Sequence, residues 1–168
     1  GTLIREFGGD IGIISSVAFS PDGQFILSSS GDTTVRLWSI NGKIIREIKQ
    51  GGIISAVAFS PNGKWIVVGN WNHPARLYDL EGKLVREFAG ESEMSSSLAI
   101  SRDGKYLLTG GSTEFGAKLW TMEGKFIREF LGHTCQVITV AFYPEGKSIL
   151  SGARDNTARC WAINGELI

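Results

Sequence analysis

The sequence predicts an all-β fold made of four copies of one antiparallel four-stranded unit. A short turn sequence recurs as AFSPDG, AFSPNG, AISRDG and AFYPEG, and its glycines are 40, 41 and 42 residues apart, at Gly23, Gly63, Gly104 and Gly146. Between these turns, apolar residues alternate with a period of two in short segments, which is typical of β-strands. No ten-residue stretch keeps the apolar period of an amphipathic helix.

Two further sets of residues keep the same spacing and define the repeats. An aromatic residue recurs at steps of 40, 42 and 41, at Trp38, Tyr78, Trp120 and Trp161. An arginine recurs at steps of 41, 40 and 42, at Arg5, Arg46, Arg86 and Arg128. The chain is therefore expected to be a single tandem array without linkers, with repeats at approximately 2–41, 42–81, 82–123 and 124–168.

The first repeat illustrates the expected strands in order. SSVAFSP (15–21), QFILSSS (24–30), TVRLWSI (34–40) and KIIREIK (43–49) are rich in β-branched and aromatic residues. Pro-Asp-Gly, Ser-Gly-Asp and Asn-Gly sequences separate them and favour tight turns. A single sheet of this kind cannot bury both of its apolar faces, so neighbouring sheets are expected to stack on each other.

Composition disfavours several classes of partner. Seventeen basic and seventeen acidic residues give a net charge of zero, so no long-range field attracts nucleic acid or a membrane surface. No segment has the length of a membrane span or the pattern of a signal peptide. Cys135 and Cys160 are too few for a disulfide framework. These features favour a reducing, cytoplasmic location.

The segment VAFSPDGQFILSSSGDTTVRLWSINGK and its three relatives resemble the WD-repeat family of β-propellers, and the likeness covers the whole chain. The resemblance implies blades of four strands arranged around a central channel. It also implies that the first strand of each sequence repeat is the outermost strand of the preceding blade.

The family resemblance implies a buried hydrogen-bond network within each blade. The fourth repeat has every member, namely His133, Ser151, Asp155 and Trp161. The first keeps Ser28, Asp32 and Trp38 but has Asp10 at the His position. The third has Thr109, Trp120 and Glu91, and the second has Val68, Asn72 and Tyr78, so we expect the second blade to be the least rigid.

No group of residues indicates catalysis, a metal or a cofactor. Ser151, His133 and Asp155 have the residue types of a hydrolase triad, but their spacing matches the structural network of the family, and no nucleophile turn accompanies them. His73 has no Cys, His or carboxylate at metal-ligand spacing. We therefore expect no enzymatic activity and no cofactor.

The resemblance implies that partners dock on the loops before the first strand and after the second strand. The loops before the first strand carry Ile13, Ile53, Met94 and Gln136, and those after the second carry Trp71, Phe115 and Arg154. Grouped apolar and arginine side chains are typical of interaction sites, although the two isoleucines could instead fold back under the loops. The predicted function is a non-enzymatic scaffold for an unknown protein or peptide. The alternative is an engineered or natural half-propeller fragment whose main property is self-assembly.

The chain begins with an outer-strand sequence, formed by Leu3, Ile4, Arg5, Glu6 and Phe7. Its charges discourage aggregation of an exposed edge, with contacts from Arg to Glu possible between neighbouring blades. Three arrangements would complete the propeller: a four-bladed ring within one chain, a longer chain, or two chains that exchange this strand. We favour a homodimer that closes an eight-bladed ring.

Overall fold

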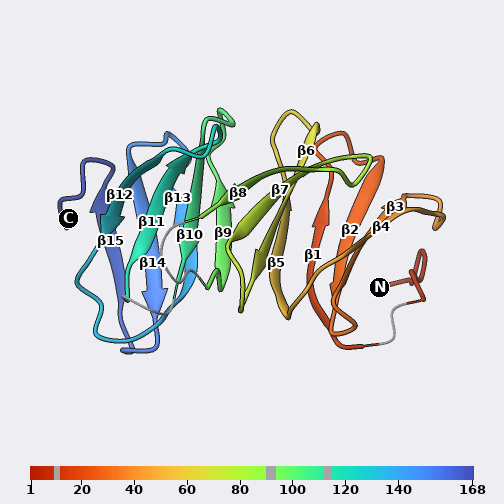
Figure 1. Cartoon of the computed structure of the whole chain (residues 1–168), viewed down its shortest axis with the longest axis horizontal. Helices are drawn as coiled ribbons and strands as arrows, with labels where there is room; N and C mark the ends of the chain where they lie inside the picture. Colours follow the sequence, from red (N-terminus) through yellow and green to blue (C-terminus); the bar gives the residue numbers. More distant parts are fainter. Residues whose placement is uncertain (10–11, 90–93, 112–114) are drawn as a thin grey trace.

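The computed structural model describes residues 1–9, 12–89, 94–111 and 115–168, and these ranges contain fifteen strands and no helix (Figure 1). The strands form four antiparallel sheets that follow one another along the chain, each built from strands adjacent in sequence. We call each sheet a blade and number the blades in chain order. The predicted all-β propeller architecture is thus confirmed.

The first three blades have four strands each, and the fourth has three. The first holds β1 (Ile14–Phe19), β2 (Phe25–Ser30), β3 (Thr34–Ser39) and β4 (Ile44–Lys49). The second holds β5 (Ile54–Phe59), β6 (Trp65–Asn70), β7 (Ala75–Asp79) and β8 (Leu84–Phe88). The third holds β9 (Ser97–Ile100), β10 (Tyr106–Gly110), β11 (Ala117–Thr121) and β12 (Phe126–Phe130). The fourth holds β13 (Val137–Phe142), β14 (Ser148–Ala153) and β15 (Ala158–Ala162).

The four strands predicted for the first repeat match β1 to β4 to within two residues. Their first turn is held by its own side chains. Ser20 Oγ accepts a hydrogen bond from the Phe25 N–H at 2.9 Å and donates one to Asp22 Oδ1. Gly23 has a φ of 69°, a backbone conformation that favours glycine. Equivalent bonds recur in the second and third blades, which explains why this turn sequence marked the repeats.

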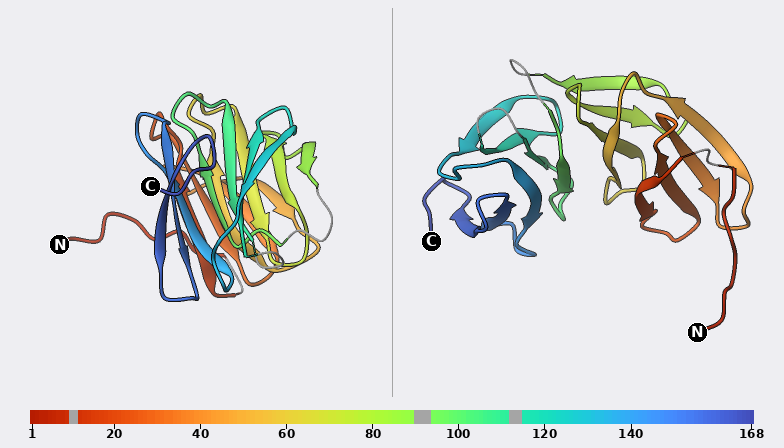
Figure 2. Two further views of the ribbon diagram at one scale, coloured as in Figure 1. Left: turned by 90° about the vertical axis from the view of Figure 1, so that its left-hand side faces the viewer. Right: turned by 90° about the horizontal axis from the view of Figure 1, so that it is seen from below.

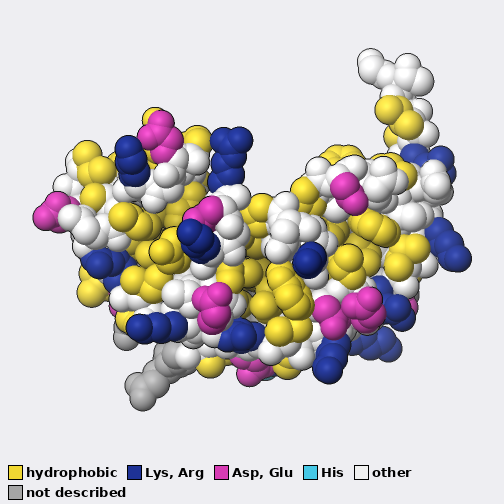
Figure 3. All heavy atoms as spheres, turned by 90° about the horizontal axis from the view of Figure 1, so that it is seen from above, with side chains coloured by type: hydrophobic (Ala, Val, Ile, Leu, Met, Phe, Trp, Pro, Cys, Tyr) yellow, Lys and Arg dark blue, Asp and Glu magenta, His cyan; other side chains and the backbone are white. Residues whose placement is uncertain are grey.

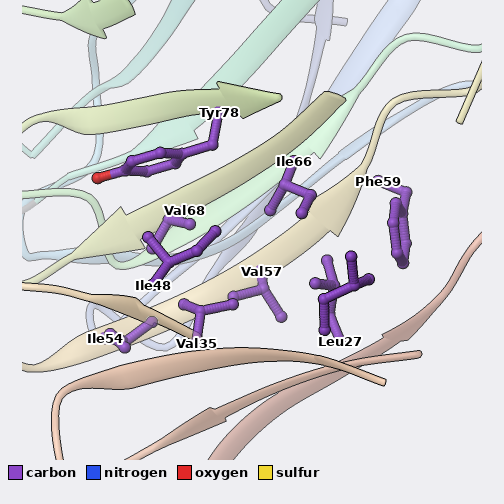
Figure 4. Close-up of a cluster of buried hydrophobic side chains, with 10 residues drawn as sticks. Leu27, Val35, Ile48, Ile54, Val57, Phe59, Ile66, Val68 and Tyr78 are labelled. Carbon is purple, nitrogen blue, oxygen red and sulfur yellow. The ribbon is translucent and has the colours of Figure 1, made fainter. Parts of the chain in front are cut away.

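The core lies between the blades rather than inside any one of them. Figure 4 shows the cluster between the first two blades, where apolar side chains of both sheets interlock. Its members are Leu27, Val35, Leu37 and Ile48 of the first blade and Ile54, Val57, Phe59, Ile66, Val68 and Tyr78 of the second. Each blade therefore depends on its neighbours for the burial of its apolar faces.

The four blades form an open arch (Figure 2). The inner strands β1, β5, β9 and β13 pack in sequence, each against the next, and the arch leaves the outer faces of the first and fourth blades uncovered. The single chain therefore does not form the closed four-bladed ring that the sequence left open.

The structure differs from the sequence prediction at residues 3–7. We expected an outer strand, but these residues lie outside every sheet, in a segment that projects from the arch. A strand requires a neighbour with free backbone groups. Residues 3–7 pair with none of the described sheets, although the side chains of Phe7 and Arg5 contact the first blade. The fourth blade has the opposite feature, because only an isolated bridge between Trp161 and Leu167 begins its outer strand.

Candidate functional site

The buried network of the fourth blade is a continuous chain of hydrogen bonds. His133 Nδ1 lies 2.8 Å from Asp155 Oδ2, and His133 Nε2 lies 2.8 Å from Ser151 Oγ. Trp161 Nε1 donates to the same Ser151 Oγ at 2.8 Å. The sequence places these residues in a loop, two strands and a turn, and the fold brings their side chains into hydrogen-bond contact.

Asp155 anchors this network at the surface end. Its carboxylate accepts hydrogen bonds from the Thr157 hydroxyl at 2.7 Å and the Thr134 N–H at 3.0 Å, in addition to its contact with His133. The bond from Thr157, followed by those from Thr134 and His133, holds the pKa of Asp155 well below its usual range. The network is therefore built around a charged carboxylate.

The triad-like set Ser151, His133 and Asp155 does not present a nucleophile. Ser151 is buried, and its Oγ is already shared between His133 and Trp161. A substrate carbonyl has no path to that oxygen without unpacking the tryptophan. The geometry suits a structural role, in which each buried polar atom satisfies another.

The other blades keep parts of this arrangement. Trp38 Nε1 donates to Ser28 Oγ at 2.9 Å, and Trp120 Nε1 donates to Thr109 Oγ1 at 3.1 Å. Asp32 accepts from the Thr34 N–H at 3.0 Å, which caps the turn before β3. The two residues predicted at the His position of these blades, Asp10 and Glu91, lie outside the described residues.

The second blade contains a hydrogen-bonded pair, Gln50 and Tyr78, that the sequence analysis did not predict. The buried side chain of Gln50 hydrogen bonds to the Tyr78 hydroxyl at 3.0 Å, while Val68 lies buried at the position of Ser28 and Ser151. Gln50 belongs to the loop that is one residue short, so no spacing pointed to it. The only signal was a tyrosine in place of tryptophan, since a buried tyrosine hydroxyl needs a partner.

The recurring Arg-Glu pair makes contacts within a sheet and between sheets. Glu47 accepts from Arg36 at 2.8 Å and Glu87 accepts from Arg76 at 2.7 Å, each within its own sheet, which the sequence did not predict. Between the second and third blades, the pKa of Glu123 is lowered by its hydrogen bond from Thr121 and, to a smaller extent, by the charge of Arg86. The arginines lie over the glycine turn of the next blade, as a side chain at Gly124 would collide with Arg86.

The predicted partner-binding residues lie along one rim of the arch, where the loops before the first strand and after the second strand of each blade lie. Backbone bonds tie the loop before the inner strand to the loop after the second strand, for example from Trp71 N–H to Ile53 O at 2.9 Å and from Arg154 N–H to Gln136 O at 2.9 Å. Ile13 and Ile53 are 86% and 61% exposed. These two isoleucines therefore do not fold back under the loops.

The remaining members of this set differ in exposure. Phe115 and Arg154 are exposed, and Phe115 has a φ of 57°, which is rare for an aromatic residue. Trp71 and Met94 are half-buried. Gln136 is buried, so its side chain is not available to a partner. We refer to Ile13, Ile53, Trp71, Met94, Phe115 and Arg154 as the loop face.

The opposite rim of the arch carries the Ser-Pro-Asp-Gly turns. Seen from that rim, basic and acidic side chains alternate around apolar ones, without a patch of one sign (Figure 3). This distribution agrees with the net charge of zero. Among the described residues, no cluster of three His, Cys, Asp or Glu side chains has the geometry of a metal site. No helix in those ranges is long and apolar enough to cross a membrane.

Comparison with known proteins identifies the repeats. The family model described as WD domain, G-beta repeat matches residues 1–39, 42–79, 82–121 and 124–162. A 38-residue stretch is 42% identical to WD repeat-containing protein 36 of Homo sapiens, which is 23% of this chain and 4% of that protein. A 31-residue stretch is 61% identical to transcription initiation factor TFIID subunit 5 of Arabidopsis thaliana, which is 18% and 5%. The matched stretches span about one twentieth of these relatives, so the likeness concerns the repeat unit.

Proposed function

Since the chain belongs to the WD-repeat family, we propose that it is a non-enzymatic scaffold whose loop face binds a protein segment or peptide. The observation that carries this proposal is the exposure of Ile13 and Ile53, large apolar side chains at the same position of two successive repeats. Isoleucine is among the residue types that folded proteins bury most often.

The composition of the loop face supports a peptide or protein ligand. Aromatic residues, methionine and arginine are enriched in the cores of protein interfaces. Besides the two isoleucines, the loop face has Trp71 in the second blade, Met94 and Phe115 in the third and Arg154 in the fourth. Backbone hydrogen bonds tie Trp71 to Ile53 and Arg154 to Gln136, so at these positions a partner meets backbone with little conformational freedom to lose. An acidic and apolar segment would match both the arginine and the isoleucines.

A selection experiment tests this proposal. The immobilised chain is used to select binders from a phage-displayed library of random peptides. We expect enriched peptides with apolar and acidic residues, and we expect the double variant Ile13→Asp/Ile53→Asp to lose them. The control Lys64→Glu changes a charge on the opposite rim of the arch, among the Ser-Pro-Asp-Gly turns, and should still bind the selected peptides. Equal binding by both variants, or no enrichment, would refute the loop face as a binding site.

Self-assembly is a second candidate function, favoured by a different observation. The two end faces of the arch expose apolar side chains that the inner blades bury. A scaffold and a self-assembling ring are compatible, because the loop face and the end faces involve different residues.

A further inference from the structure

The first blade exposes a face that the second blade buries. Val17 and its repeat equivalent Val57 are 66% and 6% exposed, although both lie at the same position of an inner strand. Phe19 and Phe59 differ in the same way. The second blade buries this face against the first, whereas the first blade has nothing in front of it.

The fourth blade exposes the complementary face. Leu27 of the first blade is 0% exposed because the second blade covers it, whereas its equivalent Leu150 is 48% exposed. Ala158 is also exposed and Cys160 is half-buried. A shallow, mostly apolar hollow of about 80 Å³ lies on this face, lined by Thr139, Val140, Ala141, Leu150, Gly152 and Ala158. The two ends of the arch thus match the two sides of an inner junction.

The N-terminal segment already lies where an outer strand of a preceding blade would lie. Phe7 packs edge-on against Trp38 with ring centroids 5.9 Å apart, as Phe130 packs against Trp161 at 6.0 Å. Arg5 covers the turn after β3 and donates to the Asn41 carbonyl at 2.8 Å. At the inner junctions such contacts join the outer strand of one blade to the next blade.

From these three observations we infer that a second copy of this chain closes the ring, with residues 5–7 of each copy pairing with β15 of the other. The inner blades set the register: Leu37, Leu77 and Leu119 of the third strands lie opposite Arg46, Arg86 and Arg128. By equivalence, Arg5 lies opposite Cys160, and Glu6 lies opposite Arg159. Leu167 and Ile168 begin this outer strand, and Arg5 to Phe7 of the second copy continue it.

The pairing gives the three-stranded fourth blade an outer strand. Glu6 provides the cross-strand partner for Arg159 that Glu47 provides for Arg36 and Glu87 for Arg76. Phe7 takes the position of the buried Phe88 and Phe130 at the edge of the hollow. Val17 and Phe19 of one copy then cover Leu150 and Ala158 of the other, which removes apolar surface from water.

A second copy is the occupant because the two faces belong to one chain and are complementary. The arch holds them on opposite ends, so they cannot meet within one molecule (Figure 2). Two arches related by a twofold axis make both junctions at once and leave no open face, which gives a closed ring of eight blades. The net charge of zero adds no general repulsion between the copies.

A disulfide experiment tests the pairing and its register. Residues directly opposite in neighbouring strands have Cα atoms about 4.5–5.5 Å apart, which a disulfide can bridge. In a Cys135→Ser background, Arg5→Cys should cross-link to the native Cys160 under mild oxidation and give a band of twice the chain mass of 18.2 kDa. The controls are Glu6→Cys, whose side chain points to the other face of the strand, and Arg5→Cys with Cys160→Ser. Neither control should cross-link.

A charge exchange provides a second, independent readout. Glu6→Arg places two arginines opposite each other at both junctions and should raise the dimer dissociation constant about tenfold in sedimentation measurements. Arg159→Glu in the same chain should restore it. A folded monomer at micromolar concentration, a cross-link of monomer mass, or equal cross-linking by Glu6→Cys would overturn the inference. Because the loop face is not involved, a monomer that still binds a selected peptide would overturn the dimer and leave the scaffold function intact.

Discussion

The second and fourth blades hold their third strands in place with different interactions. The fourth blade holds its third strand with the His133, Ser151, Asp155 and Trp161 network, while one of its faces remains open. The second blade has an apolar residue in the middle of that network and replaces the rest with a Gln50–Tyr78 pair. Both of its faces are covered by neighbouring blades.

This contrast shows how a repeat can lose its internal network and keep its fold. A blade between two others buries apolar surface on both sides, and such burial contributes about 25 cal/mol per Å². A blade at the end of the arch lacks half of that contribution and depends more on its own hydrogen bonds. The sequence led us to expect the second blade to be the least rigid, whereas its packing predicts that it is well held. Three further experiments test the comparison.

The largest effect is expected from the apolar core of the second blade. Ile66 is fully buried between the first two blades, so Ile66→Ala should lower the free energy of unfolding by about 2–5 kcal/mol in a urea titration. The conservative control Ile66→Val should cost about 0.5–1.5 kcal/mol. If Ile66→Ala cost no more than this control, packing would not be what holds the second blade.

An intermediate effect is expected from the polar network of the fourth blade. His133→Ala removes a hydrogen-bond partner from both Ser151 and Asp155 and should cost about 1–3 kcal/mol. Gln50→Ala in the second blade removes one partner of a neutral pair and should cost about 1 kcal/mol. Equal unfolding midpoints of the two variants would show that the complete network contributes no more to stability than the Gln50–Tyr78 pair.

The smallest effect is expected in the pH dependence of the free energy of unfolding. The pKa of Asp155 is lowered in the folded chain from its ordinary value of 3.8, mainly by the hydrogen bond from Thr157. Its charged form therefore stabilises the fold above about pH 4, and this contribution is lost as the pH falls further. Asp155→Asn should be less stable at pH 7 and should show a shallower loss of stability between about pH 5 and pH 2 than the unchanged chain. Parallel curves would contradict this role.

Much of the fold could be predicted because it depends on local sequence. The period-two segments and their turns located β1 to β4 to within two residues, since the Ser20, Asp22 and Gly23 chemistry acts over a few residues of the chain. The residues of the fourth-blade network could also be named, because their spacing within one repeat is characteristic of the family.

Other features of the site could not be predicted from local sequence. Gln50 and Tyr78 are separated by 28 residues and follow no repeated pattern, so only the fold shows that they meet. The sequence predicted contacts from Arg to Glu between neighbouring blades, but it did not show that Glu47 and Glu87 also pair with the third strand of their own sheets. Gln136 was grouped with exposed residues, but its side chain points inward.

The sequence by itself determined the repeat, the strand order and the turn positions, because these depend on side-chain chemistry within about forty residues. Only the tertiary structure decided which equivalent residues are buried. Val17 and Val57, or Leu27 and Leu150, have the same local surroundings in the sequence, yet they differ in exposure because burial depends on whether another blade lies in front of them. The apolar ends of the arch, and the pairing inferred from them, follow from that difference.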